Sequence, residues 1–160
     1  MRIAIIKAAG KNVQIEYDTE HKTHPNATLI ATRPGNLPCK QIFFVKWKPD
    51  SGDDDKLQQS LRDMILLVVQ NVLSHNFTSI AFPAIGCGEH KFSISIVVPT
   101  IVKELKKQLT KRNLSWLVKF IIESNQQHIY DEFCKQVSTP YEGKFLKTFY
   151  IDIMIVYAFH

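Results

Sequence analysis

The chain has 160 residues, of which 45% are hydrophobic, and a formal net charge of +5, so it is long enough for one globular domain with a real core. Scattered lysines such as Lys103, Lys106 and Lys107 fit solvated helix faces, which argues against nucleic acid as a partner and favours anionic ligands. Three cysteines without a C-x-x-C pair exclude a disulfide framework and a cysteine zinc site, and they predict an intracellular, reduced protein. No signal peptide or membrane span is expected, because no apolar run approaches about 18 residues.

The first part of the chain predicts two short strands after a helical start. Residues 2–9 have apolar side chains at helical spacing before a glycine, although the same isoleucine-rich run also fits a strand. Residues 12–17 continue that helix or begin a loop, and the polar residues 21–26 are expected to be loop. Strands are predicted over 28–32 and 41–47. The second strand is apolar on both faces at its centre, as a buried parallel or mixed sheet requires.

The rest of the chain alternates between helices and strands. After an acidic loop whose aspartates suit a helix N-terminus, the expected elements are a helix over 56–74, a strand over 78–84, a helix over about 97–110 that starts near Pro99, a strand over 117–122 and a helix over 128–137. The alternation predicts an α/β fold with one sheet covered on both faces.

Two of only six glycines stand directly after the strand predicted at 78–84. Ligands of open α/β sheets bind beyond the carboxyl ends of strands, and glycines there allow positive φ and a close approach of the backbone. Residues 85–91 therefore suit a phosphate cradle of successive N–H groups. A plain strand-to-helix turn explains G-x-G equally. No Walker lysine follows, which argues against hydrolysis of nucleoside triphosphates.

Besides these patterns, three blocks of the sequence resemble a known protein family. Residues 78–88 (TSIAFPAIGCG) resemble the strand and phosphate loop of macrodomains, and residues 34–45 (PGNLPCKQIFFV) are similar to a strand of macrodomains of the poly(ADP-ribose) polymerase class. Residues 117–122, followed by 129–133, resemble the last strand and helix of that family. The blocks keep the family's order and spacing over roughly residues 2–137.

The resemblance implies a three-layer α/β/α macrodomain-like fold with a mixed sheet and an ADP-ribose cleft. The function that it implies is a module that binds ADP-ribose or mono-ADP-ribosylated protein in the nucleus or cytoplasm, with no cofactor, and binding is favoured over enzymatic activity without excluding it. Two alternatives stay open: an ADP-ribosyl hydrolase that removes mono-ADP-ribose, and a degenerate macrodomain that acts through protein contacts.

The resemblance also implies the site residues. Those expected to wrap the diphosphate and distal ribose are Ala84, Ile85, Gly86, Cys87, Gly88, Glu89 and His90. Gly88 matches the family glycine, whereas His90 is either a ribose contact or an ordinary loop histidine. Ile122 and Glu123 fall on the adenine side, where a glutamate cannot stack as the family's aromatic ring does. A Cys87–His90 nucleophilic pair lacks an identifiable orienting group, so no catalytic residue and no metal ligand are expected.

The chain departs from the family at both ends. Residues 5–10 are similar to the end of the family's second helix, so the resemblance implies an N-terminally truncated macrodomain over 1–137 that lacks the first strand and first phosphate loop. Affinity for ADP-ribose is expected to be reduced accordingly. Residues 138–160 form a C-terminal extension. Its alternating stretch 149–158 is either an extra strand at the edge left open by the absent strand or a segment without structural role.

Overall fold

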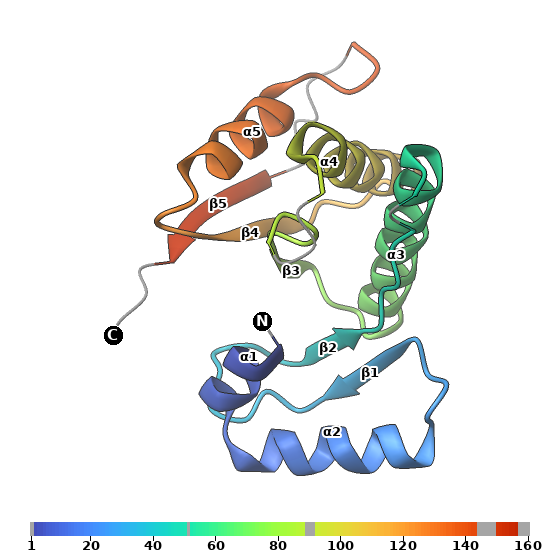
Figure 1. Ribbon diagram of the computed structural model, residues 1–160, viewed down its shortest axis with the longest axis vertical. Helices are drawn as coiled ribbons and strands as arrows, with labels where there is room; N and C mark the ends of the chain where they lie inside the picture. The colour runs from blue at the N-terminus through green and yellow to red at the C-terminus, as the bar shows by residue number, and fades with distance from the viewer. Residues whose placement is uncertain (1, 51, 89–91, 144–149, 157–160) are drawn as a thin grey trace. The chain divides into compact units, whose positions relative to one another are not determined.

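The computed structural model describes residues 2–50, 52–88, 92–143 and 150–156 (Figure 1). The chain divides into two compact units, Met1–Lys48 and Pro49–His160. The first unit contains α1 (Arg2–Ala9), α2 (Lys11–Thr23), β1 (Leu29–Thr32) and β2 (Ile42–Val45). The second contains α3 (Asp54–Ser74), β3 (Ser79–Pro83), α4 (Ile94–Lys111), β4 (Leu117–Glu123), α5 (Gln127–Ser138) and β5 (Tyr150–Val156).

The N-terminal residues adopt the helical alternative. α1 ends at Ala9. The next residue, Gly10, has φ of 97° in the left-handed region, and α2 begins directly after it. α2 runs to Thr23, so the loop expected from residue 21 starts later. Its last turns are stabilised by side chains one turn apart, because the ring of His21 stacks on Tyr17 at 5.9 Å and the Thr23 hydroxyl donates to the carbonyl of Thr19.

The strands of the first unit form a two-stranded antiparallel sheet, with Leu29 opposite Val45 and Thr32 opposite Ile42. The strand predicted over 41–47 is present as Ile42–Val45, but its centre is less buried than the apolar sequence predicted. Ile42 is buried, whereas the other three residues of β2 are half-buried. A sheet of two strands cannot bury its strands as a wide parallel sheet does. The small core of this unit joins Ile42 to Ala9 and Val13.

Gly35 is fitted tightly against the α1–α2 junction. Its φ is 59°, and a Cβ added there would overlap the carbonyl oxygen of Ala9 and lie 2.7 Å from Cγ2 of Val13. The same Ala9 oxygen accepts a 2.9 Å hydrogen bond from the Asn36 backbone N–H. Glycine at this position is therefore required both by the backbone conformation and by the close approach of two segments.

The second unit is built on a parallel sheet of order β3-β4-β5. Figure 1 shows α4 and α5 on the same side of this sheet. Phe120 of β4 stacks on Phe82 of β3 at 5.9 Å and contacts Phe133 of α5 at 4.4 Å between ring centroids. Among the described residues, the parallel strand pairs lie in this sheet and the antiparallel pair lies in the two-stranded sheet of the first unit.

α3 begins where the acidic loop predicts a helix start. The carboxylate of Asp53 accepts from the N–H groups of Asp55 at 2.9 Å and Lys56 at 3.4 Å, so it caps the first turn. The apolar side chains at helical spacing form a buried face: Leu57, Leu61, Met64, Ile65, Val68, Val69 and Val72.

α4 begins at Ile94, earlier than predicted, and contains Pro99 in its interior rather than at its start. A proline there removes one intrahelical hydrogen bond. The helix tolerates this loss because it is held by packing: Val97, Val98, Ile101 and Leu105 are at most 1% exposed. Burial of these side chains thus outweighs the local preference of proline for a first helical turn, from which the helix start near Pro99 was predicted.

Lys106 of α4 is an exception to the predicted solvated lysine face. It is 5% exposed, and its Nζ donates to the carbonyls of Gln136, Val137 and Thr139 at 2.7, 2.9 and 2.6 Å. These carbonyls lie at the C-terminal end of α5, where a helix leaves its last acceptors unpaired and carries partial negative charge. The ammonium therefore caps α5 from a neighbouring helix.

A strand is present in the C-terminal extension. β5 lies beside β4 along its whole length, from Leu117 opposite Tyr150 to Glu123 opposite Val156. The division into a macrodomain over 1–137 and an extension over 138–160 concerns family resemblance and stays a prediction; the compact units of the structure divide at residue 48 instead.

Candidate ligand-binding loop

The predicted phosphate loop begins at the carboxyl edge of the parallel sheet. β3 ends at Pro83, which lies opposite Ile121, and β4 continues to Glu123. Because the strands are parallel, the loop after β3 and the turn after β4 start at the same edge. That edge is the usual ligand position in open α/β sheets.

The first part of this loop is a tight double turn. The Ile85 N–H donates to the Pro83 carbonyl at 2.8 Å, and the Cys87 N–H donates to the Ala84 carbonyl at 3.3 Å. Gly86 between them is buried and has φ of 77°. This is the left-handed conformation for which the sequence predicted glycine, and a side chain there would be strained.

In this loop, every second backbone N–H group is left as a hydrogen-bond donor for a ligand. Those of Ile85 and Cys87 are used within the loop, whereas those of Gly86 and Gly88 have no hydrogen-bond partner among the described residues. No described atom lies within 4 Å of the position that a Gly88 Cβ would occupy. The loop therefore offers two main-chain donors and open space beside its second glycine, which is a smaller cradle than an unbroken run of donors.

The other predicted site residues differ in their surroundings. Ile122 is fully buried, so its side chain belongs to the core, whereas Glu123 is exposed at the end of β4. Glu89 and His90 lie outside the described residues. The assignment of Ala84 to His90, Ile122 and Glu123 to a ligand site stays a prediction.

Cys87 lies in surroundings that disfavour its thiolate. Its side chain is half-buried, and its Sγ contacts the Ile85 carbonyl oxygen at 3.7 Å. Desolvation by burial raises the pKa of Cys87 from 9.0 to about 11. Nucleophilic cysteines need the opposite shift, because the thiolate is the reactive species.

The Cys87 thiol is expected to react about 10-fold more slowly with iodoacetamide at pH 8 in the folded protein than in the urea-unfolded chain. The raised pKa lowers the thiolate fraction about 100-fold, and the greater nucleophilicity of a more basic thiolate offsets about 10-fold of that. Mass spectrometry of the Cys87 peptide measures the rate, with exposed Cys39 as the control. Faster reaction in the folded state would instead indicate an activated nucleophile.

The same shift has a consequence for stability. Between pH 9.0 and about 11 the folded state keeps the Cys87 proton that the unfolded state loses. The contribution of this group to the free energy of unfolding is therefore complete below pH 9.0 and falls as the pH rises through that range.

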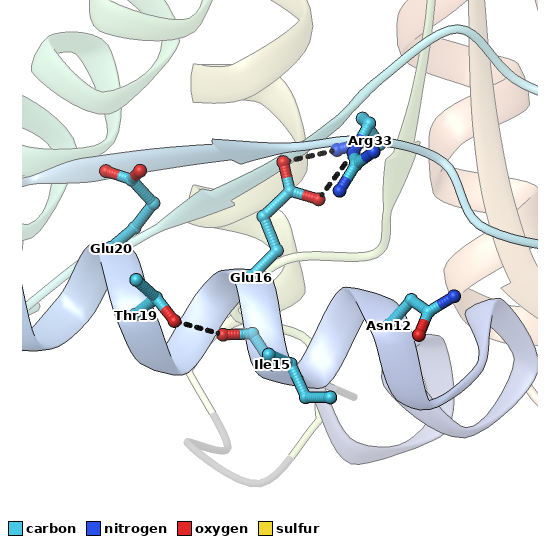
Figure 2. Close-up of a pocket in the computed structure, with 6 residues that line it drawn as sticks. All are labelled: Asn12, Ile15, Glu16, Thr19, Glu20 and Arg33. Carbon is cyan, nitrogen blue, oxygen red and sulfur yellow. Dashed lines mark hydrogen bonds and ion pairs between the residues drawn. The ribbon is translucent and has the colours of Figure 1, made fainter.

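A second feature is a shallow hollow of about 230 Å³ in the first unit, shown in Figure 2. The carboxylate of Glu16 accepts from the backbone N–H of Arg33 at 3.3 Å and from its Nε at 3.1 Å. This pair ties the end of β1 to α2. Sequence patterns do not reveal this pair, because the two residues are 17 positions apart on different elements. The hollow is lined by Asn12, Ile15, Glu16, Thr19, Glu20 and Arg33, and none of these is a predicted site residue.

In the described part of the chain, no three His, Cys, Asp or Glu side chains are grouped as metal ligands. The helices of this part are also too short or too polar to cross a membrane.

The sequence places the chain in a known family. Residues 2–101 match the family model described as Macro domain, which is more than half of the chain. The chain belongs to the macro domain family. This confirms the resemblance seen in residues 34–45 and 78–88, and it assigns the α/β macrodomain fold.

Curated relatives and solved structures agree with this membership. The chain is 26% identical over 113 residues to an O-acetyl-ADP-ribose deacetylase of Shigella flexneri, covering 70% of this chain and 64% of that protein. It is 29% identical over 146 residues to the human protein mono-ADP-ribosyltransferase PARP14, covering 84% of this chain and 8% of that protein. A structure of the Oceanobacillus iheyensis macrodomain with ADP has a TM-score of 0.73 at 21% identity, over 84% of this chain and 72% of that one.

Proposed function

We propose that this macro domain is a reader that binds ADP-ribose or ADP-ribosylated protein and does not turn it over. The observation that carries the proposal is the loop after β3, where Gly86 is left-handed and the N–H groups of Gly86 and Gly88 face no described acceptor. Main-chain donors of this kind suit a phosphate group. The names of the relatives support the choice of ligand, since they include an O-acetyl-ADP-ribose deacetylase and a mono-ADP-ribosyltransferase.

Replacing Gly88 by valine is expected to weaken binding of ADP-ribose at least about 10-fold while the thermal stability stays unchanged. Gly88 does not have a positive φ, and its Cβ position is open, so valine fits the fold but fills the space beside the two donors. Isothermal titration of ADP-ribose into wild type and Gly88→Val measures this.

The control for this variant is Gly86→Ala. Gly86 has φ of 77°, so alanine there is expected to lower the melting temperature, through backbone strain of about 1–2 kcal/mol. Equal affinity of Gly88→Val and wild type for ADP-ribose would remove the phosphate-loop assignment.

An ADP-ribosyl hydrolase is the second candidate, favoured by the deacetylase relatives alone. Against it stands the raised pKa of Cys87, because it disfavours the thiolate that a nucleophilic cysteine needs. The discriminating measurement is release of ADP-ribose from a mono-ADP-ribosylated protein, which we expect to stay at the rate without added protein. Turnover that exceeds this background would establish the hydrolase.

A further inference from the structure

Three lysines form a row along the exposed side of α4. Lys103, Lys107 and Lys111 are all exposed and stand four residues apart, so they lie on one face of the helix with a rise of about 6 Å between neighbours. Most of the other side chains of α4 are buried, among them Ile101 and Leu105. Figure 1 shows α4 between α3 and α5, which it contacts on either side. The three residues, called the lysine row below, are therefore the charged side that α4 presents to solvent.

The charges of the lysine row are balanced less well than those of other exposed helix faces. Elsewhere in the described helices, acids pair with side chains one turn away: Asp18 with Gln14, Glu20 with His24, Asp63 with Gln59 and Asp131 with Gln127. In the row, Lys107 alone has an ion pair with a described residue, to Glu104 at 3.5 Å. Like charges four residues apart repel each other and destabilise a helix. An anionic partner bound along the row would relieve this repulsion.

The residues around the row favour an acidic protein segment over a nucleic acid. Proteins hold single-stranded nucleic acids with aromatic side chains on which the bases stack, but the exposed residues of α4 besides the row are Ser95 and Thr110. The guanidinium that could hold a phosphate with two hydrogen bonds belongs to Arg112, and it donates to Gln108 instead. A helix with a glutamate at every fourth residue matches the spacing of the row, because all α-helices rise about 1.5 Å per residue.

We propose that the lysine row docks the acidic face of a helix from a partner protein, with one carboxylate on each ammonium. This contact goes beyond the proposed function, because it uses no residue of the loop after β3. Single ion pairs between exposed side chains are weak, so the affinity comes from three pairs that form together. It is expected to fall as salt is added, because ions in solution screen exposed charges.

The experiment compares two alanine-based helical peptides of equal composition by fluorescence anisotropy at low salt. One peptide has its glutamates at every fourth position, on a single face, and the other has them distributed around the helix. Wild type is expected to bind the first peptide about 10-fold more tightly than the second. Combining Lys103→Gln with Lys111→Gln should weaken binding of the first peptide about 10-fold, because two of the three ion pairs are lost.

The matched control combines Lys11→Gln with Lys22→Gln, which removes the same charge from two exposed positions of α2. It should keep the wild-type affinity for the first peptide to within about 2-fold. Equal affinity of wild type for both peptides, or equal weakening by both double variants, would overturn the lysine row as a docking site. Tighter binding of a single-stranded oligonucleotide than of the first peptide would overturn the choice of partner. ADP-ribose should bind wild type and both double variants equally, so a failure of this inference is distinguished from a failure of the proposed function.

Discussion

Replacing Lys106 by methionine is expected to lower the free energy of unfolding by about 2–4 kcal/mol, which for a chain of this size corresponds to a fall of roughly 10 °C in melting temperature. Methionine keeps the length and the apolar stem of the side chain, so the packing within α4 is preserved. The loss is of the three hydrogen bonds from Nζ to the carbonyls of Gln136, Val137 and Thr139.

The physical reason is that two effects on the charged form of Lys106 oppose each other. Burial lowers the pKa of Lys106, which means that the surroundings disfavour the charged form by removing water. Three carbonyls at the negative end of α5 favour the charged form. Removing the ammonium takes away the donor that Nζ supplies to these three carbonyls at the end of α5.

The control for Lys106→Met is Lys103→Met, an exposed lysine on the same helix. Surface substitutions of this kind change stability by less than about 0.5 kcal/mol. Chemical denaturation followed by far-ultraviolet circular dichroism measures both variants. If Lys106→Met and Lys103→Met unfold at the same denaturant concentration, the cap on α5 contributes nothing.

Replacing Gly35 by alanine is expected to lower the free energy of unfolding of the first unit by about 2–4 kcal/mol. Two effects contribute: alanine is strained in the left-handed conformation, and its Cβ overlaps atoms in a packed site. The added Cβ would overlap the carbonyl oxygen of Ala9 and approach Val13 at 2.7 Å. The junction between α1 and α2 must then move away from Asn36, whose N–H loses the Ala9 acceptor.

Gly52→Ala is the matched control for Gly35→Ala. The nearest described atom to a Cβ added at Gly52 is an Asp50 carboxylate oxygen at 3.6 Å, an ordinary van der Waals distance. This substitution should be neutral or slightly stabilising, because alanine restricts the unfolded chain. Hydrogen exchange of the amides in α2 reports on the first unit separately. Unchanged protection in Gly35→Ala would contradict the close packing described for this glycine.

Local signals predicted much of the fold. Apolar side chains at helical spacing located α3, and the two glycines after an apolar run predicted a turn with positive φ, which Gly86 adopts. These features depend on neighbours in the chain, so the sequence displays them directly. The family resemblance then supplied the fold, which a short pattern of strands and helices does not specify.

Features set by distant contacts could not be predicted in this way. Lys106 has the sequence surroundings of a surface lysine, and only the end of α5, about 30 residues away, makes it a buried cap. Pro99 lies inside α4 because buried neighbours hold the helix on both sides of it. At the candidate site, the sequence predicted a run of donors, but the Cys87 N–H is used by the Ala84 carbonyl, a detail that depends on the turn geometry.

The most direct test of the proposed function is isothermal titration of ADP-ribose into the purified chain, with AMP and ATP as controls and circular dichroism to show that the protein is folded. We expect binding in the micromolar range that is selective for ADP-ribose, because the donors of Gly86 and Gly88 would hold the diphosphate. Absence of heat from a folded protein, or equal affinity for AMP and ADP-ribose, would contradict the proposed function and would leave the loop after β3 as a strand-to-helix turn alone.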